Sequence, residues 1–169
     1  VGVADPTRLD AYRGHGGYAA LGRAVEMGPD AVIAEVSASK LLGRGGAAFP
    51  TGRKWAAVAA ESGPTKYVVC NADESEPGTF KDRVLMTGDP FAVVEAMTIC
   101  GFATGAERGV VYVRGEYPEA EARLAGAIAQ AQAAGLLGAD VSGAGFAFDI
   151  EVRRGAGAYI CGEETALFN

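Results

Sequence analysis

The sequence predicts an α/β fold in which a parallel sheet is flanked by helices and preceded by a short helical N-terminal segment. Three short apolar runs, 67–70, 110–113 and 148–152, are rich in the β-branched residues that are typical of strands. Two longer segments of helical character, 90–106 and 118–134, lie between them. Because strands and helices alternate along the chain, we expect parallel pairing through right-handed crossovers.

The N-terminal part of the chain has helical character. Residues 17–27 carry apolar side chains at helical spacing, Gly28-Pro29-Asp30 is a break, and residues 31–42 resume the pattern. With 169 residues and 49% hydrophobic content, the chain is long enough for one domain with a sizeable core. We predict a helical N-terminal segment over 1–42 and an α/β domain over 43–169.

The two helices between the strands carry typical boundary residues. Asp89 and Pro90 form an N-cap and first-position pair at the start of one helix. Gly135 follows the other helix, at the position where glycine commonly ends a helix.

Composition and charge exclude several classes of function. A net charge of −6 and a pI near 4.8 argue against nucleic acid as the main partner, which normally binds a basic face.

No apolar run approaches the roughly twenty residues that span a bilayer, and the first residues lack a signal-peptide core, so we expect a cytoplasmic protein. The three cysteines are widely spaced without a CxxC pair and His15 is the only histidine, which predicts buried free thiols and no metal site.

A polar, glycine-bearing loop follows each predicted strand, at 71–78, 114–117 and 153–159. The carboxyl ends of parallel strands meet at one edge of a sheet, and ligands bind outside that edge. The segments that precede the strands carry fewer side chains that could bind a ligand. We therefore expect a functional edge, although loops are commonly polar whatever their function.

Residues 41–55, LLGRGGAAFPTGRKW, which we call the glycine segment, combine four glycines with an aromatic ring and three cations. The run 43–48 matches the loose dinucleotide-binding pattern GxGxxA, but a predicted helix rather than a strand precedes it, which rejects the ordinary form of that motif. Glycine amides can approach a ligand closely and the cations can neutralise phosphate, so we favour a binding loop over a flexible connection. Phe49 is either a core side chain or a stacking face for a flat ring. The cations are Arg44, Arg53 and Lys54.

The acidic loop, residues 71–78, places Asp73, Glu74 and Glu76 within four positions, next to Asn71. Packed together, these carboxylates repel one another. Water, backbone amides, hydroxyl groups or a cation must therefore stabilise their negative charge. Solvation by water is the simplest interpretation of these carboxylates. The two functional alternatives are binding of a divalent metal and binding of a polyol such as a ribityl or ribose chain. The spacing does not follow an EF-hand loop and no histidine helps, which favours hydroxyl recognition.

The C-terminal segment, residues 155–165, runs from the third strand into a predicted helix start. Glu163 and Glu164 suit the positive end of a helix dipole in the first turn. Because these carboxylates would repel a phosphate, we expect this segment to meet hydroxyl groups or a ring. Tyr159 is a stacking or hydrogen-bonding partner, or a core tyrosine. Residues 81–83, by contrast, are typical of a solvated charge cluster.

Four motifs occur in order along the chain: GRGGAAFPTGRKW, CNADESEPGTFKDR, YVRGEY and RGAGAYICGEETAL. In this order and at these intervals they resemble the NADH-binding flavoprotein subunit of respiratory complex I, a subunit type that recurs as the diaphorase of NAD-reducing hydrogenases and NAD-dependent formate dehydrogenases. The resemblance extends from about Tyr12 to the last residue. It implies a Rossmann-like α/β fold that binds FMN and NAD(H).

The resemblance also implies roles for particular residues. In the family, the loop of the glycine segment lies beside the flavin and the nicotinamide nucleotide. Its phenylalanine stacks on the adenine, and its lysine supports the bound nucleotides. The resemblance assigns these roles to Gly43, Arg44, Gly45, Gly46, Phe49 and Lys54. The acidic loop would hold FMN through Asn71, Asp73 and Glu74, with Glu76 beside the nicotinamide as the one catalytic candidate. The walls around flavin and NADH would be completed by Tyr159, Gly162, Glu163 and Glu164.

The sequence departs from the family pattern in the glycine segment and just after it. The family usually has Arg where Leu42 stands, Gly where Ala48 stands, and a second adenine-stacking aromatic where Ala57 stands. The family also continues with further FMN contacts, a ubiquitin-like domain and a cysteine-ligated iron–sulfur cluster. The resemblance therefore implies that these residues form the N-terminal, FMN-binding part of a longer subunit.

The implied activity is hydride transfer from NADH to FMN, followed by electron transfer to iron–sulfur clusters on other parts or subunits. The implied partners are a thioredoxin-like iron–sulfur subunit and other subunits of a multi-subunit complex, in a peripheral arm on the cytoplasmic side of a membrane without direct insertion. Two alternatives stay open. One is a magnesium-dependent enzyme that binds nucleotide phosphates, with Mg²⁺ in the acidic loop. The other is a non-catalytic docking fragment of the same subunit.

Overall fold

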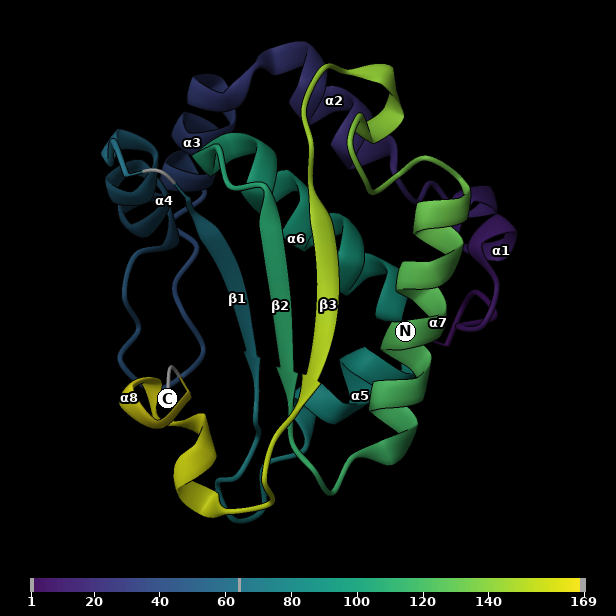
Figure 1. The fold of residues 1–169 in the computed structure, drawn as a ribbon, viewed down its shortest axis with the longest axis vertical. Helices are drawn as coiled ribbons and strands as arrows, with labels where there is room; N and C mark the ends of the chain where they lie inside the picture. Colours follow the sequence, from purple (N-terminus) through teal and green to yellow (C-terminus); the bar gives the residue numbers. More distant parts are fainter. Residues whose placement is uncertain (1, 64, 168–169) are drawn as a thin grey trace.

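The computed structural model describes residues 2–63 and 65–167 and contains a three-stranded parallel sheet with helices packed against it (Figure 1). The strands pair in the order β1-β2-β3, and their register aligns Val69 with Val110 and Val110 with Glu151. The three strands expected from the sequence, and their parallel direction, are confirmed. They are β1 (Tyr67–Ala72), β2 (Arg108–Val113) and β3 (Asp149–Arg154).

Helices form both crossovers between the strands. The first crossover contains α5 (Lys81–Gly88) and α6 (Pro90–Thr104), and the second contains α7 (Pro118–Ala133) and the short 3-10 helix η1 (Val141–Gly143). Proline opens both α6 and α7, at a position where the N–H that it lacks would have no partner inside the helix. Since α6 packs on β1 and β2, α7 packs on β3, and the two helices touch, both crossovers cover the same face of the sheet.

The hydrophobic core lies between this face and the helices. Val111 and Val113 of β2 are fully buried in one cluster with Phe91 and Val94 of α6 and Leu124 of α7. The opposite face of the sheet, turned to the viewer in Figure 1, carries no helix among the described residues. Its strands present exposed polar side chains at alternate positions: Arg108, Asp149, Glu151 and Arg153.

Tyr18 and Leu21 of the N-terminal segment join this core, whereas Val32 packs in a second, smaller cluster with Ala24 and Ala103. The helices that precede β1 are α1 (Leu9–Gly14), α2 (Ala19–Met27), α3 (Pro29–Ala38) and α4 (Thr51–Ala60), and the last three pack on α6.

Glu95 of α6 is buried and accepts hydrogen bonds from the hydroxyl of Tyr12 at 2.6 Å and from the amides of Tyr18 and Leu21 at 2.8 and 3.0 Å. This carboxylate fastens α1 and α2 to the α/β part. The division of the chain at residue 42 stays a prediction.

Several helix boundaries differ from the sequence prediction. The helix expected up to residue 42 ends at Ala38, and the second half of the glycine segment is not loop but the start of α4. The close contact of α3 with α4 explains the second difference, because a Cβ on Gly52 would lie only 2.1 Å from Oγ of Ser37. Residues 81–83, expected to be a solvated charge cluster, form the first turn of α5, where Lys81 and Arg83 are exposed.

None of the described helices alone is long and apolar enough to cross a membrane. The pair α5 and α6 passes that test by length and composition when taken together, but the two helices are bent by 97° at their junction.

Candidate functional site

The loops that follow the three strands gather at one edge of the sheet, below the strands in Figure 1. The backbone ladder continues into them, since the amide of Arg114 donates to the carbonyl of Ala72 at 3.3 Å and the amide of Gly155 donates to that of Val113 at 2.7 Å. The loops also pack closely: a Cβ on Gly115 would lie 2.8 Å from the carbonyl oxygen of Gly155. The parallel order of the strands therefore builds the shared edge that the sequence predicts.

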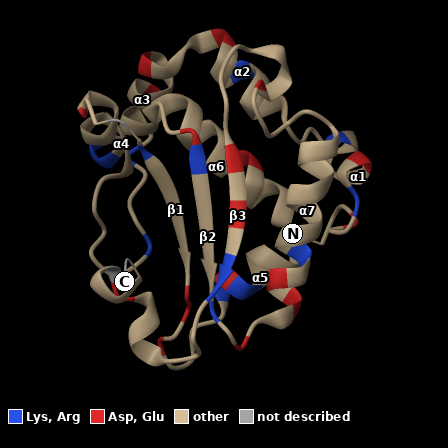
Figure 2. Ribbon diagram, viewed as in Figure 1, with Lys and Arg blue, Asp and Glu red and all other residues tan. Residues whose placement is uncertain are grey.

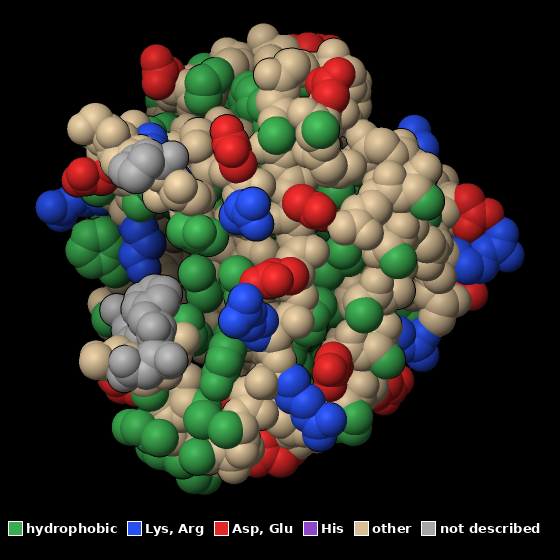
Figure 3. Space-filling view, viewed as in Figure 1, with side chains coloured by type: hydrophobic (Ala, Val, Ile, Leu, Met, Phe, Trp, Pro, Cys, Tyr) green, Lys and Arg blue, Asp and Glu red, His purple; other side chains and the backbone are tan. Residues whose placement is uncertain are grey.

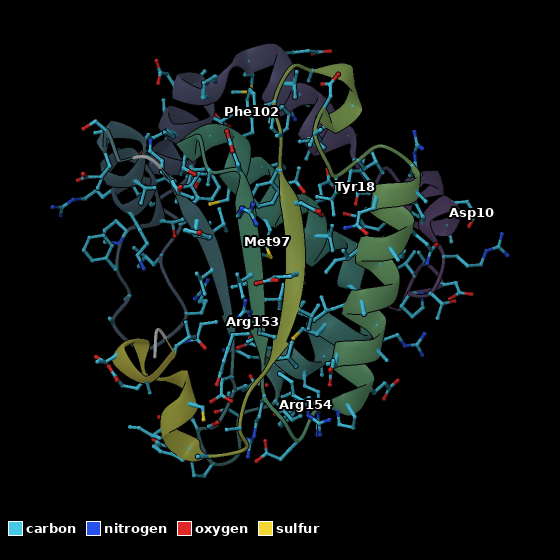
Figure 4. The ribbon with its side chains drawn as sticks, in the orientation of Figure 1. Asp10, Tyr18, Met97, Phe102, Arg153 and Arg154 are labelled. Atoms are coloured by element: carbon cyan, nitrogen blue, oxygen red, sulfur yellow. The ribbon has the colours of Figure 1, made fainter. Side chains whose placement is uncertain are left out.

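Charge is distributed unevenly along this edge. Figure 2 shows acidic residues where the chain leaves β1 and basic residues at the end of β3. The basic residues are Arg153 and Arg154, labelled in Figure 4, and Nη2 of Arg154 donates to the carbonyl of Gly115 at 2.9 Å. Apolar side chains gather at the same end of the molecule (Figure 3). Three large exposed ones belong to the loops there: Phe80, Tyr159 and Ile160.

Asp73 offers an unsatisfied oxygen at this edge. Its Oδ2 accepts a hydrogen bond from the hydroxyl of Ser75 at 2.6 Å, whereas its Oδ1 is buried without a hydrogen-bond partner in the described part of the chain. Asn71 donates through Nδ2 to the carbonyl of Gly162 at 2.7 Å, and a Cβ on Gly162 would lie 2.9 Å from Oδ2 of Asp73. Asn71, Asp73 and Gly162, all expected to hold the cofactor, thus lie together.

Glu74 has a different environment. It is only 5% exposed, and its two carboxylate oxygens accept the amides of Asp82 at 2.9 Å and Arg83 at 3.1 Å, which are in the first turn of α5. Burial disfavours the charge, but the two amide donors and the nearby Lys81 outweigh it and lower the pKa of Glu74. The sequence assigned this carboxylate to FMN, whereas in the structure both of its oxygens cap α5.

Two residues that the sequence reasoning left without a role support Glu74. Nη1 of Arg114 donates to its carbonyl oxygen at 2.7 Å, and the hydroxyl of Tyr117 lies 3.4 Å from the same oxygen. Both belong to the motif YVRGEY, and their position directly after a strand is the feature that could have indicated a role at the edge.

Glu76 and Tyr159 meet on the surface of this edge. The Tyr159 hydroxyl donates to Oε1 of Glu76 at 2.8 Å, and the Tyr159 side chain is 63% exposed. Tyr159 is therefore not a core residue, which leaves the hydrogen-bonding or stacking interpretation.

Glu163 acts as a helix cap. Its Oε2 accepts the amides of Thr165 and Ala166 at 3.0 and 3.2 Å, at the start of α8 (Glu164–Leu167), which follows the 3-10 helix η2 (Tyr159–Gly162). The backbone hydrogen bond from Thr165 is the main cause that lowers the pKa of Glu163, with burial opposing it. The expected place of Glu163 in the first turn is thus corrected to the residue before it. Glu164 opens the helix, and its side chain lies outside the described residues.

The first part of the glycine segment forms a loop closed on itself. The amide of Gly43 donates to the carbonyl of Phe49 at 2.9 Å, and Leu42 and Pro50 form an antiparallel bridge. In Figure 1 this loop runs beside β1, from the α3 and α4 end toward the side of α8. Its predicted site residues are exposed: Gly43, Arg44, Gly45, Gly46 and Phe49.

Phe49 is an exposed aromatic ring flanked by cations. It is 47% exposed, and the guanidinium carbon of Arg53 and Nζ of Lys54 lie 5.7 and 5.9 Å from its ring centroid. Of the two interpretations of Phe49, the structure excludes the core side chain. An exposed ring with two cations near it can stack on a flat, negatively charged ligand.

The carboxylates of the acidic loop diverge. Asp73 turns to Ser75, Glu74 to α5 and Glu76 to Tyr159. Within the described residues no three His, Cys, Asp or Glu side chains are placed to hold a metal ion. The cysteines are free, and burial raises the pKa of Cys70 to about 11 and that of Cys100 to about 12.

Comparisons with known proteins agree with this architecture. The chain is 51% identical to an F-type subunit of the NADH-quinone oxidoreductase of Rhizobium meliloti (strain 1021), over 99% of this chain and 40% of that protein. It is 52% identical to HndC, a subunit of the NADP-reducing hydrogenase of Solidesulfovibrio fructosivorans, over 98% of this chain and 34% of that protein. The chain therefore spans about two fifths or less of these relatives.

A solved structure and a family description complete the comparison. The NAD+-reducing [NiFe]-hydrogenase in its H2-reduced state matches with a TM-score of 0.72 and 42% identity, over 85% of this chain and 24% of that one. Residues 36–169 match the Complex1_51K family, which is described as the Nuo51 FMN-binding domain. The chain belongs to this family of FMN-binding domains.

Proposed function

We propose that this chain binds FMN at the carboxyl edge of its sheet and positions NADH beside it, as part of a longer NADH dehydrogenase subunit. Bound FMN supplies the capacity to take up a hydride as an electron pair and to release the electrons singly. The side chains of the chain need only bind, orient and shield the two cofactors.

The main support for an FMN site is the Oδ1 of Asp73, which is buried without a hydrogen-bond donor in the described residues. A buried carboxylate oxygen without a donor is costly, and the hydroxyl groups of a ribityl chain are suitable donors. Asn71 and Gly162 frame the same point, and the absence of a side chain on Gly162 lets Asp73 pack against it at close range. These residues fit FMN, and we assign Asn71, Asp73, Gly162 and Tyr159 to it.

The glycine segment is assigned to the nucleotide of NADH. Phe49 would stack on the adenine, while Arg44 and Lys54 would neutralise the pyrophosphate. The backbone amides of Gly43, Gly45 and Gly46 would lie against the ligand. Glu76, held by Tyr159, would face the nicotinamide.

The partners proposed for this chain follow from its relatives. Those relatives are named as subunits of NADH-quinone oxidoreductases and hydrogenases, which are multi-subunit enzymes. We propose that electrons leave toward iron–sulfur clusters outside this chain, including those of a thioredoxin-like subunit, within a peripheral arm on the cytoplasmic side of a membrane.

The test is a titration of the purified chain into FMN, followed by the loss of flavin fluorescence. We expect saturable quenching by the native chain and about tenfold weaker binding by Asp73→Asn, since one acceptor for a hydroxyl becomes a donor. The matched control is Glu151→Gln on the open face of the sheet, which should bind as tightly as the native chain. Equal affinity of Asp73→Asn and the native chain would contradict the assignment.

A docking fragment remains the second candidate, because the chain spans at most about two fifths of these relatives. It predicts a folded chain that does not quench FMN. The magnesium-dependent alternative predicts nucleotide binding that requires Mg²⁺, and the divergence of the acidic-loop carboxylates argues against it.

A further inference from the structure

Arg114 lies directly after β2 and reaches across the sheet edge to the acidic loop. Its Nη1 donates to the carbonyl oxygen of Glu74 at 2.7 Å, and its side chain is only 26% exposed. This contact joins two loops that follow neighbouring strands and lie forty residues apart in the chain. A guanidinium-to-carbonyl hydrogen bond with a charged donor is among the stronger hydrogen bonds in proteins.

Glu74 is thereby held at both ends. Its carboxylate is fixed by the amides of Asp82 and Arg83, and its carbonyl is fixed by Arg114. Glu74 stands between Asp73, which carries the unsatisfied Oδ1, and Glu76, which meets Tyr159. Fixing the two ends of Glu74 therefore fixes the directions in which its neighbours point.

Neighbouring side chains hold Arg114 itself in place. Glu116 pairs with the guanidinium: Nη2 donates to its Oε1 at 3.2 Å, and its Oε2 lies 3.0 Å from Nε, which makes no hydrogen bond within the described residues. The guanidinium carbons of Arg83 and Arg114 lie 5.5 and 5.6 Å from the ring centroid of Tyr117. Arginine can donate to a carboxylate from one terminal nitrogen and to a carbonyl from the other, and a lysine cannot reproduce both contacts with the same geometry.

We propose that Arg114 is a positioning residue that holds the acidic loop in the conformation presenting Asp73 and Glu76 to the cofactors. This inference rests on the proposed function for the cofactors, but the contact and its effect on the loop exist without them. Arg114 touches neither ligand in this account and acts through Glu74. The motif YVRGEY thereby acquires a role: it supplies the arginine, its carboxylate partner and its aromatic support.

The first experiment measures the loop in the ligand-free chain. We compare amide hydrogen exchange in the native chain, in Arg114→Gln and in the control Arg108→Gln, whose position is at the opposite end of β2. Exchange at Thr79, Asp82 and Arg83, whose amides are bonded within or to the acidic loop, should be about tenfold faster in Arg114→Gln alone. Unchanged exchange at these amides would overturn the proposal, whether or not the chain binds FMN.

The second experiment measures FMN affinity with the same chains and Arg114→Lys. We expect about tenfold weaker binding by Arg114→Gln, partial recovery in Arg114→Lys because an ammonium can still donate to the Glu74 carbonyl, and native affinity in Arg108→Gln. Native affinity in Arg114→Gln, or an equal loss in Arg108→Gln, would overturn the proposal. Absence of FMN binding by the native chain would instead contradict the proposed function, and the exchange experiment would still decide whether Arg114 holds the loop.

Discussion

The hydroxyl of Tyr159 donates a hydrogen bond to Oε1 of Glu76 at 2.8 Å and so ties the C-terminal segment to the acidic loop. The carboxylate raises the pKa of Tyr159, first through this hydrogen bond and then through its negative charge, because both favour the neutral phenol. The two side chains come from loops that follow different strands. Their contact joins Glu76, which we assign to the nicotinamide, to Tyr159, which we assign to the flavin.

Loss of this hydrogen bond should weaken the binding of NADH more than the binding of FMN. In Tyr159→Phe the ring stays while Glu76 loses its partner, so we expect KM for NADH in anaerobic flavin reduction to rise about fivefold. The FMN dissociation constant should change by less than about twofold, as the ring still covers the flavin. Tyr67→Phe, an exposed tyrosine at the start of β1, is the control. A larger loss of FMN affinity than of NADH affinity would contradict the assignment.

Ala48 adopts a backbone conformation that favours glycine. Its φ is +49°, in the left-handed region that glycine adopts without strain. Ala48→Gly should therefore raise the free energy of unfolding by about 1 kcal/mol, measured by urea denaturation. The control is Ala47→Gly, since Ala47 is not among the residues with positive φ, and it should be neutral or destabilising. No gain from Ala48→Gly would show that the loop does not hold this conformation in solution.

The Glu95 carboxylate should be essential for docking of the N-terminal helices. Glu95→Gln turns one acceptor into a donor that faces the Tyr18 amide and the Tyr12 hydroxyl, which should lower the free energy of unfolding by about 2 kcal/mol. Tyr12→Phe removes a single hydrogen bond and keeps the ring stacked on Phe91, so it should cost about 1 kcal/mol. Glu35→Gln, an exposed residue of α3, should change little. A loss no larger for Glu95→Gln than for Glu35→Gln would contradict this role.

The Glu74 cap predicts a pH dependence of stability. Its pKa in the folded chain is lower than the ordinary value of 4.5, so its contribution is complete above about pH 4.5 and is lost as the pH falls through the folded pKa. The difference in free energy of unfolding between the native chain and Glu74→Gln should therefore shrink as the pH falls below about 4.5. Denaturation at several pH values measures it. A difference that is constant with pH would mean that the charge of Glu74 does not support α5.

The sequence predicts the elements whose evidence is local. The three strands and the two long helices have apolar patterns of the right period, and their alternation predicts the parallel sheet and its shared carboxyl edge. α5 could not be predicted in this way, because the carboxylate that caps it belongs to Glu74, outside the helix, and reaches it only after the chain folds back. The start of α4 could not be predicted for a similar reason. Gly52 does not favour a helix by itself, and its role is to allow the close contact with Ser37, which the sequence does not show.

The candidate site shows the same limit. The sequence indicates which loops carry carboxylates, glycines and aromatic rings, and the structure brings Asn71, Asp73 and Gly162 together. It does not indicate that Glu74 caps a helix, because that contact requires the chain to fold back after β1. Nor does it indicate the contact of Arg114 with Glu74, which joins loops that follow different strands. The assignment of the cofactor residues stays a prediction that the experiments above test.

The most direct test of the central claim is the anaerobic addition of NADH to the purified chain loaded with FMN, followed by the visible absorbance of the flavin. We predict that the absorbance is bleached in proportion to the NADH added, and that the bleaching is slowed in Asp73→Asn but not in Glu151→Gln. An FMN-loaded, folded chain whose flavin absorbance does not change when NADH is added would contradict the claim that this edge of the sheet places the two cofactors together.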